Sequence, residues 1–235
     1  MLEIILIQMY NKEDLSSFNG YNMARKSSHA DRKLISEGRR LLIKKGASSL
    51  SIRELADAAG VNLGMFSYYF RNKETFTQII LEEIYNDFLS DLAVDEESDD
   101  LENLRRQLLV MAKFARDNRV LILSLLNDVL NKERAVQKFV RAKMNRHFLI
   151  IAKTVKRCQR KGIVINGPLP LILTQIVGSI GLSNLIPEAI KRLGINKAFN
   201  NGIGTLTKSL TSDDALYQRV DMTLRGLKAE TSVEN

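Results

Sequence analysis

Cysteine and histidine are scarce in this sequence of 235 residues. Cys158 is the single cysteine, and His29 and His147 are the two histidines. One thiol cannot form an intramolecular disulfide, and this small set excludes a zinc site built on thiolates and imidazoles. We therefore expect no metal and no cofactor, in a protein suited to a reducing cytoplasm.

Helix breakers and aromatic residues are also few. The chain has three prolines, thirteen glycines and no tryptophan, and aromatic residues make up 6% of it. Leucine, isoleucine and lysine are abundant instead, which favours helices over strands. The composition predicts an all-α protein.

Long apolar runs are missing as well. The N-terminal run from Leu2 to Met9 is too short to span a bilayer, and it lacks the basic start of a signal peptide. The stretch 169–186 comes closest in length, but five polar residues interrupt it: Thr174, Gln175, Ser179, Ser183 and Asn184. We interpret this stretch as a buried helix and expect no membrane partner.

Residues 1–24 match none of the helical patterns that follow them. We expect an N-terminal arm that is either loosely held or absent from the natural protein, because Met23 offers a second start. An intact natural chain beginning at Met1, detected by mass spectrometry, would exclude the shorter start.

Apolar periodicity and capping residues predict two helices after this arm. The first spans 30–45 and ends at Gly46, a natural C-terminal stop. The second begins after Ser51, where Glu54 completes a capping-box pattern, and it closes at Gly60.

Two more helices and an acidic segment come next. Asn62 caps a helix that runs through Tyr69, and Asn72 caps a longer helix over 73–91. Seven acidic side chains within residues 91–102 are typical of a solvated connection between domains. Further apolar-periodic stretches lie at 101–116, 119–131, 133–161, 169–186 and 213–228.

The segment 51–74 has the pattern of helix, tight turn and helix. Ala56 is small where two helices approach closely, and Gly60 supplies the positive φ that a sharp turn often needs. Three apolar side chains can fill a small core: Val61, Phe66 and Phe70. Six residues would then face outward: Asn62, Leu63, Gly64, Met65, Ser67 and Tyr68. A helix of this size fits the DNA major groove, where base edges differ in their donors and acceptors.

The charge distribution agrees with a DNA-binding role. The chain has a net charge of +8, and residues 25–73 hold eleven basic and four acidic residues, an excess of +7. Neutralised phosphates supply most of the sequence-independent affinity of DNA-binding domains. A solvated basic face on the first helix is the alternative interpretation of the same charges.

In this segment the sequence resembles the TetR/AcrR family of bacterial repressors, over about residues 28–90. The shared features are the length of the first helix, Gly46, the helix start at Ser51 and three short motifs. These motifs are Ala-Ala-Gly-Val at 58–61, Tyr-Tyr-Phe at 68–70 and Asn-Lys-Glu at 72–74.

The resemblance implies roles for individual residues. Those implied to face the groove are Asn62, Leu63, Gly64, Met65 and Tyr68. Those implied to contact the DNA backbone are Ser51, Tyr69 and Lys73. The remaining predicted DNA-binding residues are Arg25, Lys26, Arg53 and Ser67. Of Tyr68 and Tyr69, we expect one to be buried and the other to face DNA.

Four positions depart from the family pattern. Ser67 stands where the family often has Tyr, Met65 stands where Thr or Ala is common, and Leu42 and Ala47 replace frequent aromatics. Leu63 and Met65 can contact a thymine methyl group but cannot form the paired bonds that recognise guanine. These departures leave the base sequence of the operator open.

The alternative interpretation of the segment 51–74 is a three-helix packing unit without a DNA role.

The predicted domains are an arm over 1–24, a helix-turn-helix domain over 25–72, a connecting helix over 73–92 and a ligand-binding and dimerisation domain over 93–235. The resemblance implies that the last long helices dimerise as a four-helix bundle. Gly178-Ser-Ile-Gly181 and the helix near 216–227 are the candidates, with packing inside one chain as the alternative.

The resemblance also implies a ligand pocket. Polar residues within apolar helices are candidates to line it: Gln107, Asn127, His147, Gln175 and Ser179. A lone His147 is more often a surface residue or a satisfied core residue than a ligand contact. The helix over 133–161 is rich in Arg and Lys, which usually means a solvated face. An anionic, largely apolar inducer is the sharper hypothesis.

These inferences lead to the hypothesis of a ligand-responsive DNA-binding regulator. It would be a repressor that binds a palindromic operator as a homodimer and is released by a small-molecule inducer. A non-specific architectural DNA-binding protein is the alternative. An enzyme is disfavoured because the sequence lacks a Gly-x-Ser-x-Gly elbow, a Gly-Lys-Ser/Thr phosphate loop and a His-Glu-x-x-His motif. Gly202-Ile-Gly204 lacks the third glycine of a dinucleotide motif and is interpreted as a loop.

Overall fold

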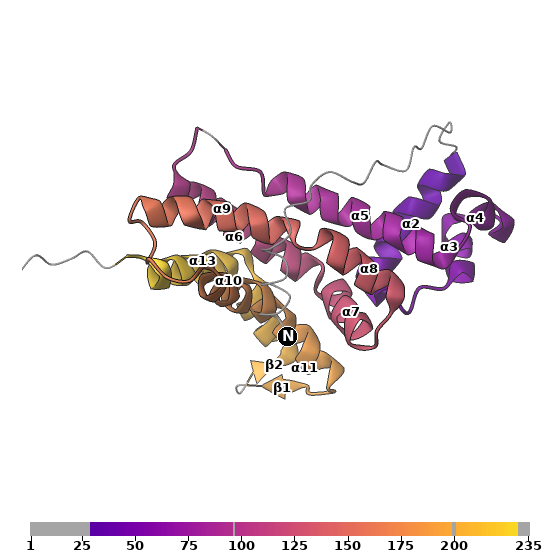
Figure 1. Ribbon diagram of the computed structural model, residues 1–235. Coiled ribbons are helices and arrows are strands. Elements are labelled where there is room, and N and C mark those ends of the chain that lie inside the picture. The colour runs from indigo at the N-terminus through magenta and orange to yellow at the C-terminus, as the bar shows by residue number, and fades with distance from the viewer. Residues whose placement is uncertain (1–28, 96, 199–200, 230–235) are drawn as a thin grey trace, which may run out of the picture. The chain divides into compact units, whose positions relative to one another are not determined.

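The computed structural model describes residues 29–95, 97–198 and 201–229, which form two compact units (Figure 1). The first unit comprises residues 29–85 and 124–145, and the second comprises residues 86–123 and 146–229. Helices α5 (Lys73–Asp91) and α7 (Arg119–Leu130) each begin in one unit and end in the other.

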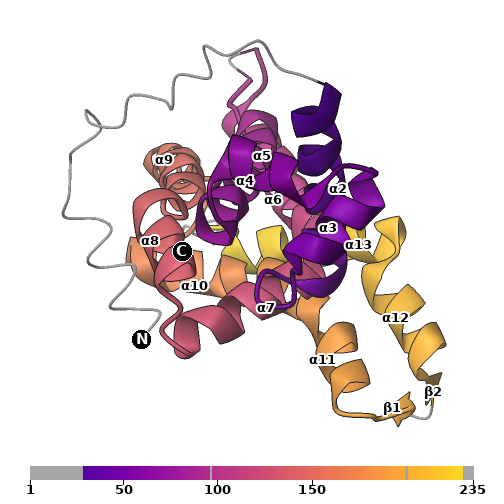
Figure 2. The ribbon, with the colours of Figure 1, turned by 90° about the vertical axis from the view of Figure 1, so that its right-hand side faces the viewer.

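The described residues are almost entirely helical, which confirms the predicted all-α class. The other helices of the first unit are α2 (His29–Lys45), α3 (Ile52–Ala59), α4 (Leu63–Phe70) and α8 (Arg134–Lys143). Those of the second are α6 (Asp100–Asp117), α9 (Arg146–Arg160), α10 (Leu169–Ile176), α11 (Ile186–Arg192), α12 (Ile203–Thr211) and α13 (Asp213–Leu227). A short hairpin of β1 (Lys197–Ala198) and β2 (Asn201–Gly202) joins α11 to α12, which lie side by side (Figure 2).

Local capping bonds fix the ends of the short helices in the first unit. The Ser51 hydroxyl accepts from the Glu54 N–H at 3.4 Å, and the Asn62 carbonyl Oδ1 accepts from the Gly64 N–H at 2.8 Å. Gly60 ends α3 with φ of 64°, as the turn requires. The capping box is only half formed, because the Glu54 carboxylate instead accepts from Lys45 Nζ at 2.5 Å.

Three aromatic rings hold the first unit together. Phe76, in the first turn of α5, packs with ring centroids 5.2 Å from Phe66 and 4.8 Å from Phe70. All three rings are buried. Gly38 of α2 gives the Phe76 ring its space, since a Cβ at this glycine would lie 2.4 Å from Phe76 Cζ. The prediction that Phe66 and Phe70 fill the core is confirmed, whereas Val61 is only half-buried.

The second half of α7 packs beneath the loop that follows α2. Gly46 has φ of 86°, and a Cβ there would lie 2.1 Å from Ser124 Oγ. Asp128 of α7 is buried, and its Oδ2 has no hydrogen-bond partner among the described residues. Burial, with the nearby Glu133 carboxylate, raises the pKa of Asp128, although Ser48 and Lys73 act in the opposite direction.

In the second unit, α6 packs against both α9 and α13. Leu104, Leu108 and Ala112 of α6 are fully buried. Arg105 pairs with Asp221, and Arg116 pairs with Asp213 at 2.5 Å, so two ion pairs link α6 to α13.

The predicted helix over 133–161 is wrong, because α8 and α9 are separate helices. A turn at Met144 and Asn145 divides them, and the two compact units meet in the sequence at this point. Val136 and Phe139 are buried in the first unit, while Ile151 and Val155 are buried in the second. The two halves therefore serve different cores.

The stretch 169–186 is helical but irregular. After α10 it continues as a π-helical segment η1 (Val177–Gly181) and a 3₁₀ segment η2 (Leu182–Leu185) before α11. Ser179 donates to the Gln175 carbonyl at 2.8 Å, and Asn184 donates to the Ile180 carbonyl at 2.8 Å. Such bonds compete with the regular backbone pattern. The loop prediction for Gly202-Ile-Gly204 is also wrong, because α12 begins at Ile203.

Of the described residues, only Leu169–Arg192 is long and apolar enough to cross a membrane by length and composition, and 33% of its most apolar window is buried. A core helix passes the same test, so this is weak evidence for a membrane span. The prediction of a buried helix is wrong for one face, where Leu171 is 65% exposed.

We expect Gly38→Ala to destabilise the protein by about 1–3 kcal/mol, because its Cβ would overlap the Phe76 ring. Gly226→Ala is the matched control, since Gly226 also lies in a helix and a Cβ there meets no atom within 4 Å. Urea unfolding compares the two variants. Equal stabilities would contradict the assigned role of Gly38.

We expect Asp128→Asn to stabilise the protein at pH 7 by about 1 kcal/mol, because a neutral amide replaces a carboxylate whose ionisation is opposed by burial. Because the folded-state pKa of Asp128 is raised, its ionised form opposes folding above that pKa. The gain should shrink as the pH falls through that pKa toward the unfolded value of 3.8. Urea unfolding at pH 7 and at about pH 4 measures it, and a gain independent of pH would contradict the assignment.

Candidate nucleic-acid interface

Helix α4 has one buried face and one exposed face. Phe66 and Phe70 point into the core, as described above. The side facing solvent carries four exposed residues of the predicted recognition set: Leu63, Gly64, Ser67 and Tyr68. Leu63 is 50% and Tyr68 is 59% exposed, so neither is sequestered inside the protein. Asn62 is exposed at the N-cap, and Met65 is half-buried.

The prediction that one of Tyr68 and Tyr69 is buried is wrong. Tyr69 is half-buried and Tyr68 is exposed, so neither side chain is fully buried. Their rings pack edge to face with centroids 5.0 Å apart, and Tyr69 also lies 6.2 Å from Phe70. The Tyr69 ring therefore supports the exposed Tyr68 ring from the side of the core.

The predicted DNA-backbone contacts lie on α3, which packs against α4, and at the start of α5. Ser51 at the N-cap of α3 and Arg53 in its first turn are both exposed. Lys73 is half-buried at the start of α5, and its ammonium group donates to the Ser48 carbonyl at 3.1 Å. Arg25 and Lys26 lie outside the described residues.

Lys73 therefore has a structural contact that the sequence pattern did not indicate. Its ammonium group joins α5 to the loop after α2, and it also helps keep Asp128 ionised. Sequence reasoning missed Ser48, Ser124 and Asp128, which connect this loop to α7. No local pattern could have found them, because their contacts join segments about 80 residues apart along the chain.

Basic side chains are exposed along α2 beside these elements. Five of them are exposed: Arg32, Lys33, Arg40, Lys44 and Lys45. Helix α4 itself contains no charged residue. The arrangement can therefore attract phosphates through its flanks and present amide, hydroxyl and apolar groups at its centre.

The five predicted ligand-binding residues are not brought together. Asn127 lies in the first unit, whereas the other four lie in the second. Asn127 and Gln175 are exposed, and Ser179 is half-buried and accepts from Thr223 Oγ1 at 3.1 Å.

Gln107 and His147 are the two buried members of this set. Gln107 donates to the Leu92 carbonyl at 3.0 Å, while its own Oε1 has no hydrogen-bond partner among the described residues. The His147 ring packs 5.5 Å from Phe88 and 3.9 Å from Phe148. Burial lowers the pKa of His147 to about 3, so this imidazole is neutral at pH 7.

Comparisons with known proteins agree with this geometry. The family model of "Bacterial regulatory proteins, tetR family" matches residues 34–78, from α2 into α5. The chain is 21% identical over 165 residues to "Probable HTH-type transcriptional regulator YttP" of Bacillus subtilis, covering 68% of this chain and 80% of that protein.

Solved structures share the fold. A transcriptional regulator from Saccharomonospora viridis, in complex with choline, matches with a TM-score of 0.68 at 16% identity, covering 87% of this chain and 100% of its own. The hemolysin II transcriptional regulator HlyIIR matches with a TM-score of 0.57 at 18% identity, covering 86% and 100%. At this level of identity these two likenesses show the fold alone.

The family model places its match on the helices that present the exposed face of α4, and YttP is described as a regulator of the helix-turn-helix type. Members of this family regulate transcription and are not enzymes. Residues 34–78 of this protein match the family model of TetR-type bacterial regulators, and the rest of the chain shares the fold of solved transcriptional regulators.

Proposed function

We propose that the protein is a repressor that binds a palindromic operator as a homodimer and leaves it when a small-molecule inducer binds. The observation that supports this most directly is the solvent-exposed face of α4, which has no charged residue. The neighbouring helices α2 and α3 carry exposed basic residues. A bacterial cytoplasm is the compartment in which it would act.

In the proposed complex, α4 enters the major groove with its N-terminal turn toward the bases. Leu63 and Tyr68 lie on the exposed side, where they can contact base edges or thymine methyl groups. Ser51 and Arg53 are placed to contact phosphates, and the N-terminus of α5 is a favourable position for a further phosphate. Two such helices in a dimer would enter successive grooves about 34–36 Å apart.

An exposed apolar stripe supports the proposed dimer. Along α10, η1, η2 and α11 the exposed residues recur at helical spacing: Leu171, Gln175, Gly178, Leu182 and Ile186. A Cβ at Gly178 would meet no atom within 4 Å, so packing inside one chain does not require a glycine there. A second copy could approach closely at this position.

Helix α13 lies beside this stripe and extends it. It packs against η1, and Thr223 donates to Ser179 there. Met222, which precedes Thr223 in the chain, is 72% exposed. Two helical segments from each copy would form the four-helix bundle that the sequence predicted.

Four of the five candidates for the inducer site lie in the second unit. The buried Gln107 with its unpartnered Oε1 and the neutral His147 lie in the second unit and are the strongest of the five candidates. The Saccharomonospora viridis regulator, which shares the fold, was solved in complex with choline, and this supports a small-molecule ligand for the present protein. Inducer and operator would then compete through linkage, with α5 changing its tilt.

A footprint on genomic fragments tests the proposal against a non-specific architectural role. We expect protection of a discrete palindrome, whereas an architectural protein would protect every sequence equally. Uniform protection would overturn the proposal.

Two variants test the assignment of side chains at that operator. Arg53→Ala should weaken binding to all operator variants similarly and lower the salt slope by about one, as expected for a lost phosphate contact. Leu63→Ala should change the preferred base pairs, by about 1–3 kcal/mol at the affected position. Arg53 is a cleaner probe than Lys73, which also binds Ser48. A sequence-selective loss from Arg53→Ala would contradict these roles.

For the dimer, we expect Leu171→Glu with Leu182→Glu to give a monomer, because both changes place charge on the apolar stripe. Light scattering coupled to size-exclusion chromatography measures the mass. The matched control is Leu126→Glu with Leu130→Glu on α7, whose leucines are 46% and 64% exposed. This control should stay dimeric, and a dimeric stripe variant would argue against the interface.

A further inference from the structure

Arg71 has a strained backbone conformation at the end of the proposed recognition helix. It directly follows the last residue of α4 and has φ of 63° and ψ of −56°. Among the described residues, only Arg71 and Lys132 have a positive φ without being glycine. The Asn72 N–H donates to the Phe70 carbonyl at 2.7 Å, so Arg71 is the central residue of a γ-turn. The positive-φ form of this turn is rare and costly for a residue that has a side chain.

Packing on both sides of the turn explains why it is so tight. Phe70 ends α4 and Phe76 lies in the first turn of α5, and their buried rings have centroids 4.8 Å apart. Asn72 already caps α5, since its Oδ1 accepts from the Thr75 N–H at 2.8 Å. Only Arg71 is left to turn the chain between the two helices. Packing therefore requires the positive φ, but it does not require an arginine.

The choice of residue at this turn has two physical explanations. Glycine or asparagine would adopt a positive φ at a lower cost, so the turn alone does not favour a long side chain. A cation at the C-terminus of a helix interacts favourably with the helix dipole, and this is the structural explanation for a basic residue. Strained residues also cluster at functional sites, which is the functional explanation.

The Arg71 side chain is available to a ligand. Arg71 is exposed, and its side chain has no ion pair or hydrogen bond within the part of the chain that the structure describes. Two other cations of the first unit are engaged instead. Arg40 pairs with Glu37 at 2.8 Å, and Lys73 donates to a backbone carbonyl at 3.1 Å.

Arg71 follows the exposed face of α4. Its N–H still donates to the Ser67 carbonyl at 3.1 Å, which places Arg71 one helical turn after Ser67. Ser67 and Tyr68 are both exposed members of the predicted recognition set. Lys73, two residues further along the chain, is a predicted contact to the DNA backbone. Arg71 therefore stands between the predicted base contacts and a predicted phosphate contact.

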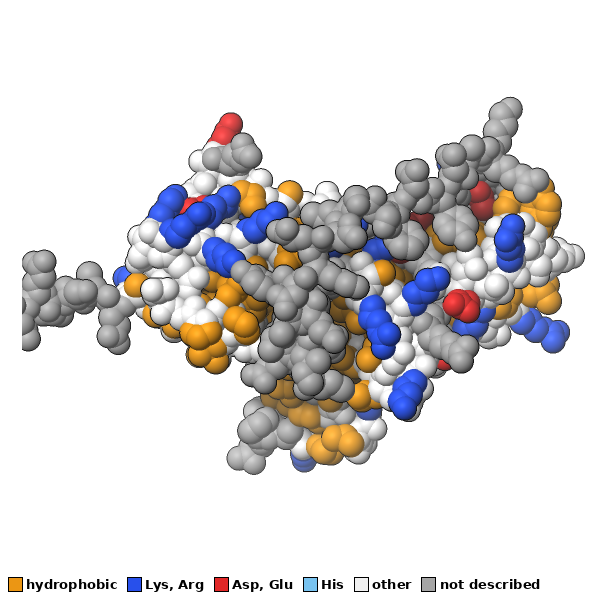
Figure 3. Space-filling model, viewed as in Figure 1, with side chains coloured by type: hydrophobic (Ala, Val, Ile, Leu, Met, Phe, Trp, Pro, Cys, Tyr) orange, Lys and Arg blue, Asp and Glu red, His pale blue; other side chains and the backbone are white. Residues whose placement is uncertain are grey.

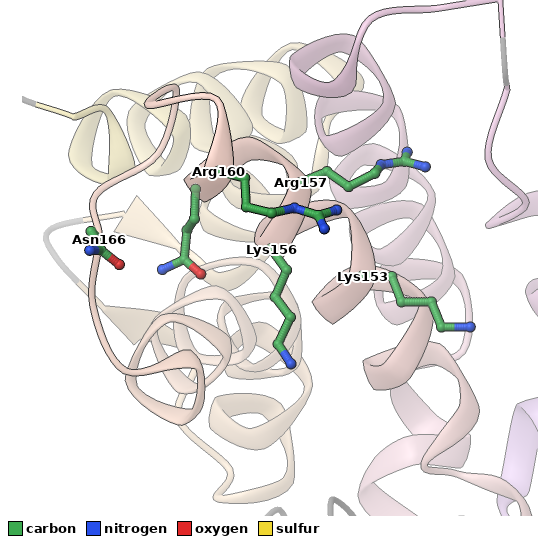
Figure 4. Close-up of a pocket in the computed structure, with 6 residues that line it drawn as sticks. Lys153, Lys156, Arg157, Arg160 and Asn166 are labelled. Carbon is green, nitrogen blue, oxygen red and sulfur yellow. The ribbon is translucent and has the colours of Figure 1, made fainter.

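The basic residues of α9, in the second unit, are arranged differently. In the view of Figure 3, Lys and Arg side chains lie over α9 as well as over helices of the first unit. Figure 4 shows that Lys153, Lys156 and Arg160 point apart. Arg157 is paired with the buried Asp100 at 2.8 Å. These cations do not converge on one ligand, so they carry no comparable inference.

We propose that the Arg71 guanidinium binds a phosphate of the DNA backbone at the edge of the groove that α4 enters. This inference rests on the proposed entry of α4 into the major groove, and it adds a contact that the sequence pattern did not assign. The N-terminal residues of a recognition helix contact the bases, so its C-terminal end lies nearer the backbone. A guanidinium can donate two parallel hydrogen bonds to one phosphate.

Binding of a fluorescent DNA duplex of mixed sequence tests the inference without the operator, because phosphate contacts do not depend on sequence. Arg71→Gly removes the guanidinium and relieves the backbone strain. It should weaken binding about fivefold or more at low salt and lower the salt slope by about one. Its urea midpoint should not fall. Arg71→Lys keeps the positive charge and should therefore keep the salt slope of wild type.

Lys132→Gly is the matched control, because Lys132 is also an exposed cation of the first unit and has φ of 59°. It should bind the duplex within about twofold of wild type. Wild-type binding by Arg71→Gly, equal losses in the two glycine variants, or the same reduced salt slope for Arg71→Lys and Arg71→Gly would overturn the inference. A wild-type protein that binds no duplex would contradict the proposed function as well.

Discussion

The packing of Phe76 against the helix-turn-helix core is the contact on which the rest of the first unit depends. This ring belongs to the first turn of α5, yet it lies against Phe66 and Phe70 of α4 and under Gly38 of α2. The start of α5 is therefore fixed to α4, the proposed recognition helix. Any change in the direction of α5 must carry α4 with it, because a close-packed aromatic cluster transmits displacement instead of absorbing it.

Polar contacts near this aromatic cluster also link α5 to the other helices of the first unit. Lys73 binds Ser48, and Gly46 lies against Ser124, so the loop after α2 is held by both α5 and α7. Helices α5 and α7 each continue into the second unit. Both helices that hold this loop are therefore shared with the second unit, which contains the proposed inducer site.

Local signals predicted the first unit well. The Ser51 and Asn62 caps, the left-handed Gly60 and the buried Phe66 and Phe70 all follow from residue type and spacing over a few positions. Local signals failed where distant segments decide the outcome. The pattern over 133–161 is continuous in sequence, yet Phe139 and Ile151 are buried in different units, and the chain turns between them.

The sequence by itself determined the helical class, the position of the DNA-binding helices and the exposed side of α4, because capping, glycine turns and apolar periodicity are short-range effects. Only the tertiary structure decided which polar residues meet. It placed Asp128 beneath the Ser48 loop, and it joined Ile165, in the loop after α9, to Leu227 at the end of α13. These arrangements depend on contacts between residues far apart in the chain, and no local pattern encodes such distances.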